Sequence, residues 1–144
     1  MAASKAERGY RLFTGRDTPP VKARPLALGE DITPRQAFRS IALNCLEQLQ
    51  ANERGARLGQ DSEYVHQARV AIRRLRSALK LFAPALPAPF LDHWEEPWRA
   101  LGAQLGDARN WDVLLGETLP PLLTTFPGDP DVAHFQTLAR ARQQ

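Results

Sequence analysis

Basic side chains recur at helical spacing in the segment EYVHQARVAIRRLRSALKLF, residues 63–82. At about 100° per residue, one histidine, three arginines and one lysine fall within an arc of about 80°, over about 21 Å of helix axis. We call this set the basic row: His66, Arg69, Arg73, Arg76 and Lys80. Arg74 points away from the arc and could flank the row or contact a neighbouring helix. A guanidinium binds two phosphate oxygens at once, so the row predicts an anion-binding surface.

The lack of acids beside these cations needs a physical reason. Like charges at i, i+3 and i+4 repel by a few tenths of a kcal/mol per pair, yet residues 64–82 contain no Asp or Glu. This cost favours an external anion, or acids contributed by another helix, over a merely solvated face.

His66 has several possible roles, including that of a core histidine or a metal ligand. It lies on the polar arc, and no second ligand follows at helical spacing. A hydrogen bond to an anion, or help in orienting Arg69 or Arg73, is therefore favoured over metal binding. The sequence predicts no metal site and no cofactor.

Composition limits the class of protein. The chain of 144 residues is 43% hydrophobic and 24% charged, as expected for one globular domain. The single cysteine excludes an internal disulfide and fits a reducing compartment, and no segment has the length and apolar character of a signal peptide or membrane span. We therefore expect a cytoplasmic protein without a membrane partner.

Charge is unevenly distributed, although the formal net charge is only +3. Residues 62–83 hold five basic side chains and one acid, whereas residues 84–144 hold four basic side chains and eight acids. Local clustering of this kind matters more for anion capture than the total charge.

The first predicted helix begins at Thr33, a suitable N-cap, with Pro34 at the first helical position. One apolar stripe follows at helical spacing: Phe38, Ile41, Ala42, Cys45, Leu46 and Leu49. Gly55 and Gly59 are predicted to end the helix. Because Cys45 falls on the stripe, we interpret it as a small core residue rather than a reactive thiol.

The second predicted helix carries the basic row. Asp61 or Ser62 can cap it, and Pro84 and Pro87 close it. Its predicted core face lies roughly opposite the row and consists of Val65, Ala68, Ile72, Leu75, Leu79 and Phe82.

The next part of the chain predicts two helices, from about 89 to 105, with a kink at Pro97, and from about 108 to 119. The tryptophans there share helical spacing with leucines, so we interpret them as core residues. The sequence GDARNWDVLL is interpreted as a turn that places Arg109 and Asn110 near a helix start, where free amides favour an anion.

A Pro-rich connector, LPPLLTTFPGDP, and a last helix from about Pro130 complete the pattern. Strand patterning is nearly absent, so the predicted fold class is all-α, an antiparallel four-helix bundle. Residues 1–31 are rich in Pro, Gly and charge and predict an irregular linker, with a short strand at GYRLF.

The segment VHQARVAIRRLRSALKLF resembles the signature of CHAD domains, a family named for a conserved histidine in an α-helical domain. LGDARNWDV resembles the turn that follows it in that family. The resemblance implies half of a domain built from two four-helix bundles around a basic groove, with residues 32–144 as a partial domain that ends early. It also implies binding of inorganic polyphosphate. The matching residues are His66, Arg69, Arg73, Arg74, Arg76 and Arg109; we add Lys80, Arg35 and Arg39 from position and charge.

The chain departs from the family pattern in two ways. Asn110 stands where the family usually has an acid that orients a nearby arginine, and the second half with its own basic helix is missing. The chain would therefore supply about one wall of the groove. At its start, SKAERGYRLF resembles the end of a CYTH domain, a triphosphate tunnel enzyme often fused ahead of CHAD. Triphosphatase activity would belong to that absent part, so we predict no enzyme.

Two other classes of function remain open. A nucleic-acid-binding module would use the same basic row but would normally add exposed aromatic side chains, which the polar arc lacks. An enzyme needs a nucleophile, a carboxylate pair or a metal site, and Asp107 and Asp112 are better explained as capping and helix-turn residues. We therefore predict polyphosphate binding, at polyphosphate granules or in the service of a fused triphosphatase domain, with binding of nucleic acid or another polyanion as the alternative.

Overall fold

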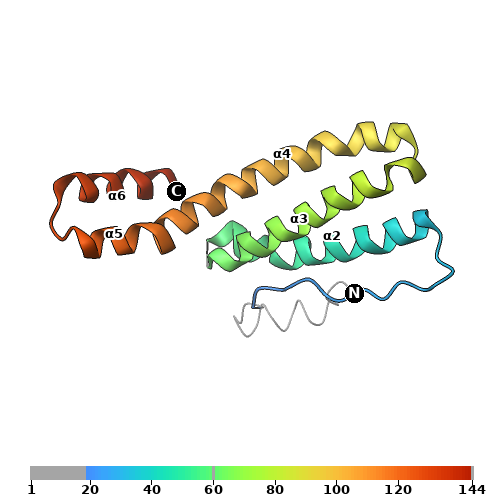
Figure 1. Ribbon diagram of the computed structural model, residues 1–144, viewed down its shortest axis with the longest axis horizontal. Helices are drawn as coiled ribbons and strands as arrows, with labels where there is room; N and C mark the ends of the chain where they lie inside the picture. Colours follow the sequence, from blue (N-terminus) through green and yellow to red (C-terminus); the bar gives the residue numbers. More distant parts are fainter. Residues whose placement is uncertain (1–18, 60, 144) are drawn as a thin grey trace. The chain divides into compact units, whose positions relative to one another are not determined.

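The computed structural model describes residues 19–59 and 61–143, and most of this part of the chain is helical (Figure 1). The α-helices are α2 (Pro34–Leu58), α3 (Ser62–Phe82), α4 (Ala88–Val113), α5 (Leu119–Thr125) and α6 (Pro130–Gln143). A 3-10 turn, Ala83–Ala85, follows α3, and a π-helical stretch, Leu114–Thr118, joins α4 to α5. The described residues contain no strand, which confirms the all-α prediction. The strand predicted at GYRLF lies outside the described residues.

The chain divides into two compact units, one up to Gly102 and one from Ala103 onward, and each is described by itself. The first unit contains α2, α3 and the first part of α4. The second contains the last part of α4, the π-helical stretch, α5 and α6.

The ends of α2 follow from local sequence. Thr33 is the N-cap of the helix, as predicted, and it forms a capping box: its hydroxyl accepts a hydrogen bond from the Gln36 amide (3.3 Å), and Gln36 Oε1 accepts one from the Thr33 amide (3.0 Å). Gly59 ends it in the left-handed conformation, with φ of 60°. The prediction that Gly55 helps to end the helix is wrong. Gly55 lies inside α2, where a Cβ would overlap the ring of Tyr64.

Helix α3 begins at the Asp61 cap, whose carboxylate accepts a hydrogen bond from the Glu63 amide at 2.8 Å. It ends at Phe82, before the 3-10 turn that contains Pro84. Four of the predicted core residues are buried, namely Ala68, Ile72, Leu75 and Leu79, whereas Val65 and Phe82 are half-buried. The buried arc is wider than predicted because it also includes Tyr64, Gln67, Ala71 and Ala78.

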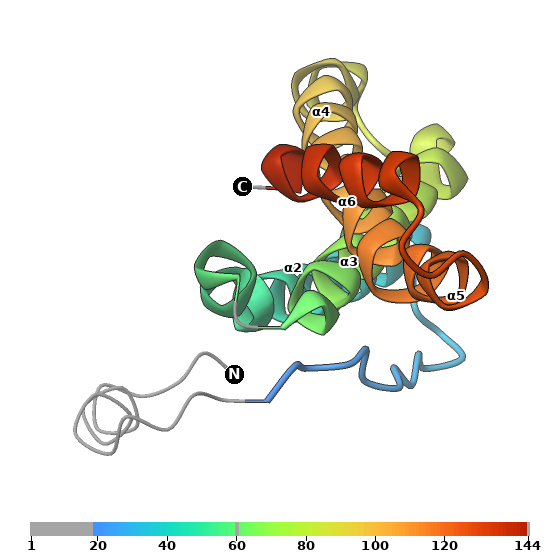
Figure 2. The same cartoon turned by 90° about the vertical axis from the view of Figure 1, so that its left-hand side faces the viewer.

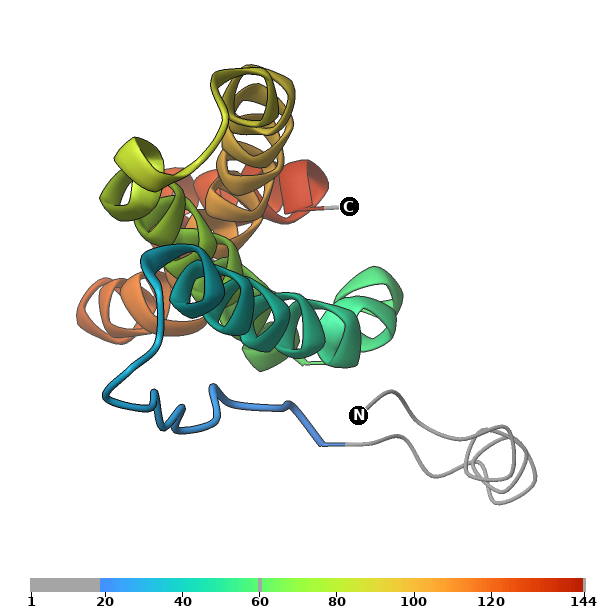
Figure 3. The same ribbon diagram turned by 90° about the vertical axis from the view of Figure 1, so that its right-hand side faces the viewer.

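Helices α2 and α3 lie side by side and antiparallel, and α3 lies between α2 and the first part of α4 (Figures 1 and 3). Phe38 on α2 packs with Ala78 and Leu79 on α3 in a buried apolar cluster, against which Trp98 of α4 also packs. The ring of Phe38 meets that of Phe90 edge to face, with centroids 6.0 Å apart. This core fixes the face that α3 turns outward.

An extended segment, residues 19–29, precedes α2 and runs back along that helix (Figures 1 and 3). Asn52, which is fully buried, donates to the carbonyl of Val21 (2.8 Å) and accepts from its amide (2.9 Å). One side chain therefore satisfies both backbone groups of Val21, as a neighbouring strand would. This pair of bonds holds the segment against α2.

The predicted helix break between residues 105 and 108 is wrong, because α4 continues from Ala88 to Val113 with Pro97 inside it. A glycine within a helix lowers stability by only about 1 kcal/mol relative to alanine, so a helix can continue through it. At Gly102 the missing side chain also permits close packing. A Cβ at this position would lie 3.2 Å from the Ile72 side chain of α3. Gly102 therefore reflects the approach of α4 to α3 and not a helix end.

In the second unit, α5 and α6 are adjacent (Figure 2). The segment predicted as a Pro-rich connector is helical over Leu119–Thr125, with proline in the first turn of α5, where α5 itself needs no amide donor. Helix α6 begins at Pro130 as predicted, and the Asp129 carboxylate accepts hydrogen bonds from the two amides after Pro130. Leu119 and Ala139 are the buried apolar residues of this unit.

Candidate functional site

The basic row lies along one face of α3, where Arg69, Arg73 and Lys80 are exposed and His66 and Arg76 are half-buried. Within residues 19–59 and 61–143, no hydrogen bond or ion pair engages any of these five side chains. One explanation for the acid-free row was that acids from another helix supply the counter-charges. The described part of the chain gives this explanation no support, because it contains no ion pair to the row.

Two members of the row line a cleft between α3 and α4 of about 230 Å³. Arg76 and Lys80 come from successive turns of α3, and Glu95 faces the same cleft from α4. The rest of the wall is apolar and consists of Leu79, Ala83 and Leu91. A cleft of this size has room for a small anionic group.

Arg76 is partly buried because it lies against α4 at Gly102. A Cβ at that glycine would come 3.4 Å from Arg76 Nη1 and 3.7 Å from its Cδ, so the arginine passes where a side chain is missing. Packing of the aliphatic part against the helix reduces the freedom of the guanidinium. Less conformational entropy is then lost when it binds an anion.

Arg74 belongs to the α2–α3 interface and does not join the row. Its guanidinium donates to Gln48 Oε1 at 3.0 Å and to Asn44 Oδ1 at 2.9 Å, both on α2. Two positions were predicted for Arg74, one beside the basic row and one against a neighbouring helix. The structure shows the second.

The bonds of Arg74 continue into a chain of side-chain amides. Gln48, which is buried, donates to Gln67 Oε1 at 2.9 Å, and Gln67 donates to the Glu63 carboxylate at 2.7 Å. Each amide turns its oxygen toward Arg74 and its NH₂ group toward Glu63. A cation and an anion about three helical turns apart are therefore connected through polarised hydrogen bonds.

Cys45 also lies in this interface, with 1% of its surface exposed, and its thiol is free. Burial raises the pKa of the Cys45 thiol, and the positive charge of Arg74 partly opposes that shift. The interpretation of Cys45 as a core residue is confirmed.

Arg35 and Arg39 line a different groove, of about 470 Å³, between the start of α2 and the start of α4. Its floor is apolar and includes Phe38, Leu86 and Phe90. None of its lining residues is shared with the cleft that contains Arg76 and Lys80. The structure therefore does not bring the two added arginines into one cleft with the row.

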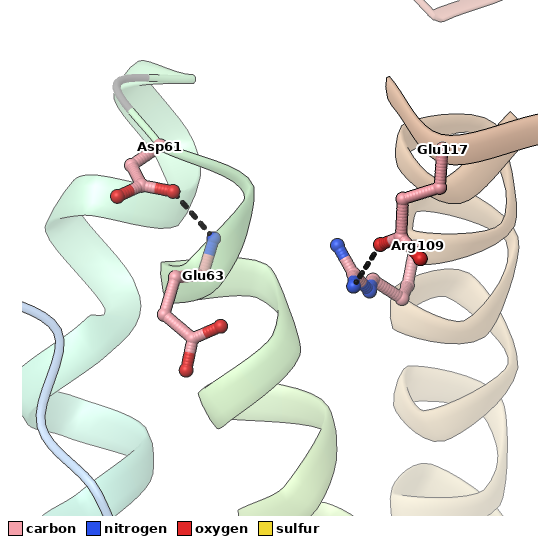
Figure 4. A network of polar contacts seen from close by, with 4 residues as sticks. All are labelled: Asp61, Glu63, Arg109 and Glu117. Atoms are coloured by element: carbon pink, nitrogen blue, oxygen red, sulfur yellow. Dashed lines mark hydrogen bonds and ion pairs between the residues drawn. The ribbon is translucent and has the colours of Figure 1, made fainter. Parts of the chain in front are cut away.

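Arg109 belongs to the second unit, where its Nη2 donates to Glu117 Oε1 at 3.0 Å (Figure 4). The predicted helix start beside Arg109 and Asn110 is wrong, because α4 runs through both residues. The free amides that were expected to favour an anion there are consequently absent from this stretch. The Arg109 side chain is only 17% exposed.

The interpretation of the tryptophans as core residues is wrong for Trp94. It is 38% exposed and stacks on Trp98, with ring centroids 5.8 Å apart. Trp98 in turn packs against the core. An exposed aromatic ring is thus present on α4, although the polar arc of α3 carries no Phe, Tyr or Trp.

In residues 19–59 and 61–143, no group of three or more His, Cys, Asp or Glu side chains is arranged to hold a metal ion. None of the helices in these ranges combines the length and the apolar character that a membrane-spanning helix requires.

Glu95 was missed at the sequence level, because its position depends on the register of α4 against α3. The buried amides of Gln48 and Asn52 carried a signal that was available: they continue the apolar stripe of α2 past Cys45 at helical spacing. Polar residues at positions that continue the buried stripe of a helix predict buried hydrogen bonds between helices.

Fold and basic row together define a helical module with cations gathered on one face of one helix. The family model described as "CHAD domain" matches residues 40–144, and the chain belongs to this family. Among solved structures, the chain is similar to the CHAD domain from the plant Ricinus communis, with 42% sequence identity and a TM-score of 0.65. That match covers 86% of this chain and 42% of the plant chain, so this chain spans less than half of the length of that relative. Comparison with curated proteins finds no match. The CYTH resemblance precedes the matched residues and stays a prediction.

Proposed function

We propose that this chain binds inorganic polyphosphate through the basic row of α3. The observation that carries the proposal is the set of cations on one helix face with no acidic partner in the described residues. CHAD domains are associated with polyphosphate binding, which supports the choice of anion.

The shape of the row suits a linear polyanion. Arg69, Arg73 and Lys80 follow one another at intervals of four and seven residues, which spreads their charges over about 17 Å of axis. A compact anion would meet one or two of these cations, whereas a chain of phosphates meets them in succession. The cleft beside Arg76 then receives one phosphate unit of the chain.

The other predicted residues have different places in this proposal. Arg74 supports the row by holding α3 to α2. Arg35 and Arg39 line their own groove and contribute at most long-range attraction. The contribution of Arg109 depends on the second unit, where Glu117 is its partner.

Binding without hydrolysis is part of the proposal. The residues that line the α3–α4 cleft include one carboxylate but no second carboxylate and no hydroxyl or thiol nucleophile. We propose that the module retains polyphosphate for another activity, either at polyphosphate granules or beside a fused triphosphatase domain.

A competition titration tests the proposal. The chain is titrated with fluorescently labelled long-chain polyphosphate, and duplex DNA is then added at equal phosphate concentration. We expect saturable binding that the DNA displaces poorly, without release of orthophosphate during the measurement. Equal displacement by DNA would replace this proposal with a general polyanion-binding module, and orthophosphate release that survives repurification would make the chain an enzyme.

A further inference from the structure

One carboxylate shares the cleft of the basic row. Glu95 of α4 lines the same space as Arg76 and Lys80, yet within the described residues it forms no ion pair with either of them. It therefore does not neutralise one cation by direct contact. Its negative charge remains in the space that an anion would enter.

The adjacent acid behaves differently. Glu96 forms an ion pair with Arg99 on the same helix and is not among the residues that line the cleft. Both acids are exposed, and each adds one negative charge to the same turn of α4. The two differ in whether they face the cleft, so Glu96 is a matched control for Glu95.

The effect of Glu95 on a bound phosphate depends on the charge of that phosphate. With Arg76, Lys80 and Glu95 all ionised, the cleft carries a net charge of +1. An interior unit of polyphosphate carries one negative charge, whereas a terminal phosphate, like a phosphate monoester, approaches two at neutral pH. Coulomb repulsion is proportional to charge, so the carboxylate disfavours a dianion about twice as strongly, in free energy, as a monoanion.

We propose that Glu95 is a specificity-determining residue that weakens the binding of dianionic chain ends more than that of monoanionic interior units of a polyphosphate chain. This inference rests on the proposed function, because it assigns a chain-length preference to the same site. The apolar walls formed by Leu79, Ala83 and Leu91 strengthen the repulsion, since they keep high-dielectric water from part of the cleft. Glu95 thus shifts the preference of the cleft away from short phosphates with dianionic ends and toward long chains.

The test compares Glu95→Gln and Glu96→Gln with the unmodified chain, each titrated with long-chain polyphosphate and with tripolyphosphate at pH 7.5 and low salt. We expect Glu95→Gln to bind long-chain polyphosphate about threefold more tightly and tripolyphosphate about tenfold more tightly. Glu96→Gln should change both affinities by less than about twofold, because its charge is already paired. Urea unfolding of all three proteins checks that the folded state is intact.

Three results would overturn the inference while leaving the proposed function in place. Equal gains from both variants would show a diffuse effect of net charge, and equal gains for both ligands would remove the selectivity. A loss of affinity in Glu95→Gln would mean that the carboxylate orients the cations instead of opposing the anion. Absence of polyphosphate binding in the unmodified chain, without recovery in Glu95→Gln, would overturn the proposed function and this inference with it.

Discussion

The Arg74 guanidinium donates a hydrogen bond to Gln48 Oε1 across 3.0 Å, from α3 to α2. Arg73, its neighbour in sequence, is exposed on the basic row and has no hydrogen bond or ion pair within the described residues. Two adjacent arginines of one motif therefore have different surroundings. One serves the interface that holds the helices together, and the other faces the solvent that a ligand would replace.

The first prediction concerns stability. Arg74→Met leaves the buried oxygen of Gln48 without its donor, so we expect a loss of about 2 kcal/mol in the free energy of unfolding. Arg73→Met should change that free energy by less than about 0.5 kcal/mol, because the side chain is exposed. Urea denaturation followed by circular dichroism measures both. Equal stability losses would contradict the division of roles between the two arginines.

The second prediction concerns the segment that precedes α2. Asn52→Ala removes both hydrogen bonds to the backbone of Val21, so residues 19–29 should separate from α2 more often. Trypsin should then cleave after Lys22 at least several times faster. Gln50→Ala, an exposed change on the same helix, provides the control. Unchanged cleavage in Asn52→Ala would show that other contacts hold the segment.

The third prediction concerns pH. Because burial raises the pKa of the Cys45 thiol above its ordinary value of 9.0, the folded state holds this proton more tightly than the unfolded chain. The corresponding stability is fully present below about pH 9 and is lost as the pH rises through the raised pKa. We expect Cys45→Ala to show a shallower fall of the free energy of unfolding between pH 8.5 and 10.5. Parallel profiles for the two proteins would contradict burial of the thiol.

The fourth prediction concerns salt. Polyanion capture releases counterions, and about four contacts on the row give a slope of about −3 in log affinity against log salt concentration. Arg73→Ala should make that slope shallower by about 0.7, whereas Arg140→Ala, on α6, should leave it unchanged. Binding titrations from 50 to 300 mM salt measure the slopes. A slope that Arg73→Ala leaves unchanged would remove this arginine from the contact surface.

Local signals predicted the parts of the fold that depend on a few neighbouring residues. Thr33, Pro34 and Gly59 mark the ends of α2 because capping satisfies backbone groups within one turn. The outward face of α3 was predictable for a similar reason, since the apolar residues opposite the row leave only one way to pack the helix.

Other features depend on contacts between distant segments. A glycine such as Gly102 can either break a helix or permit close packing, and only its packing against Ile72 shows that the helix continues. The partners of Arg74 could not be chosen from its angle on the helix alone, because they require the register of α3 against α2. The same limitation applies to Glu95, which enters the cleft from a third helix.

The central claim, that the exposed row of α3 binds polyphosphate, is tested most directly by one comparison of affinities. Arg73→Met and Arg74→Met are titrated with long-chain polyphosphate under conditions in which both proteins are folded. We expect Arg73→Met to lose about fivefold to tenfold in affinity, because a charge-assisted contact is removed, and Arg74→Met to stay within about twofold of the unmodified chain. An equal loss in both variants, or a larger loss in Arg74→Met, would contradict the claim.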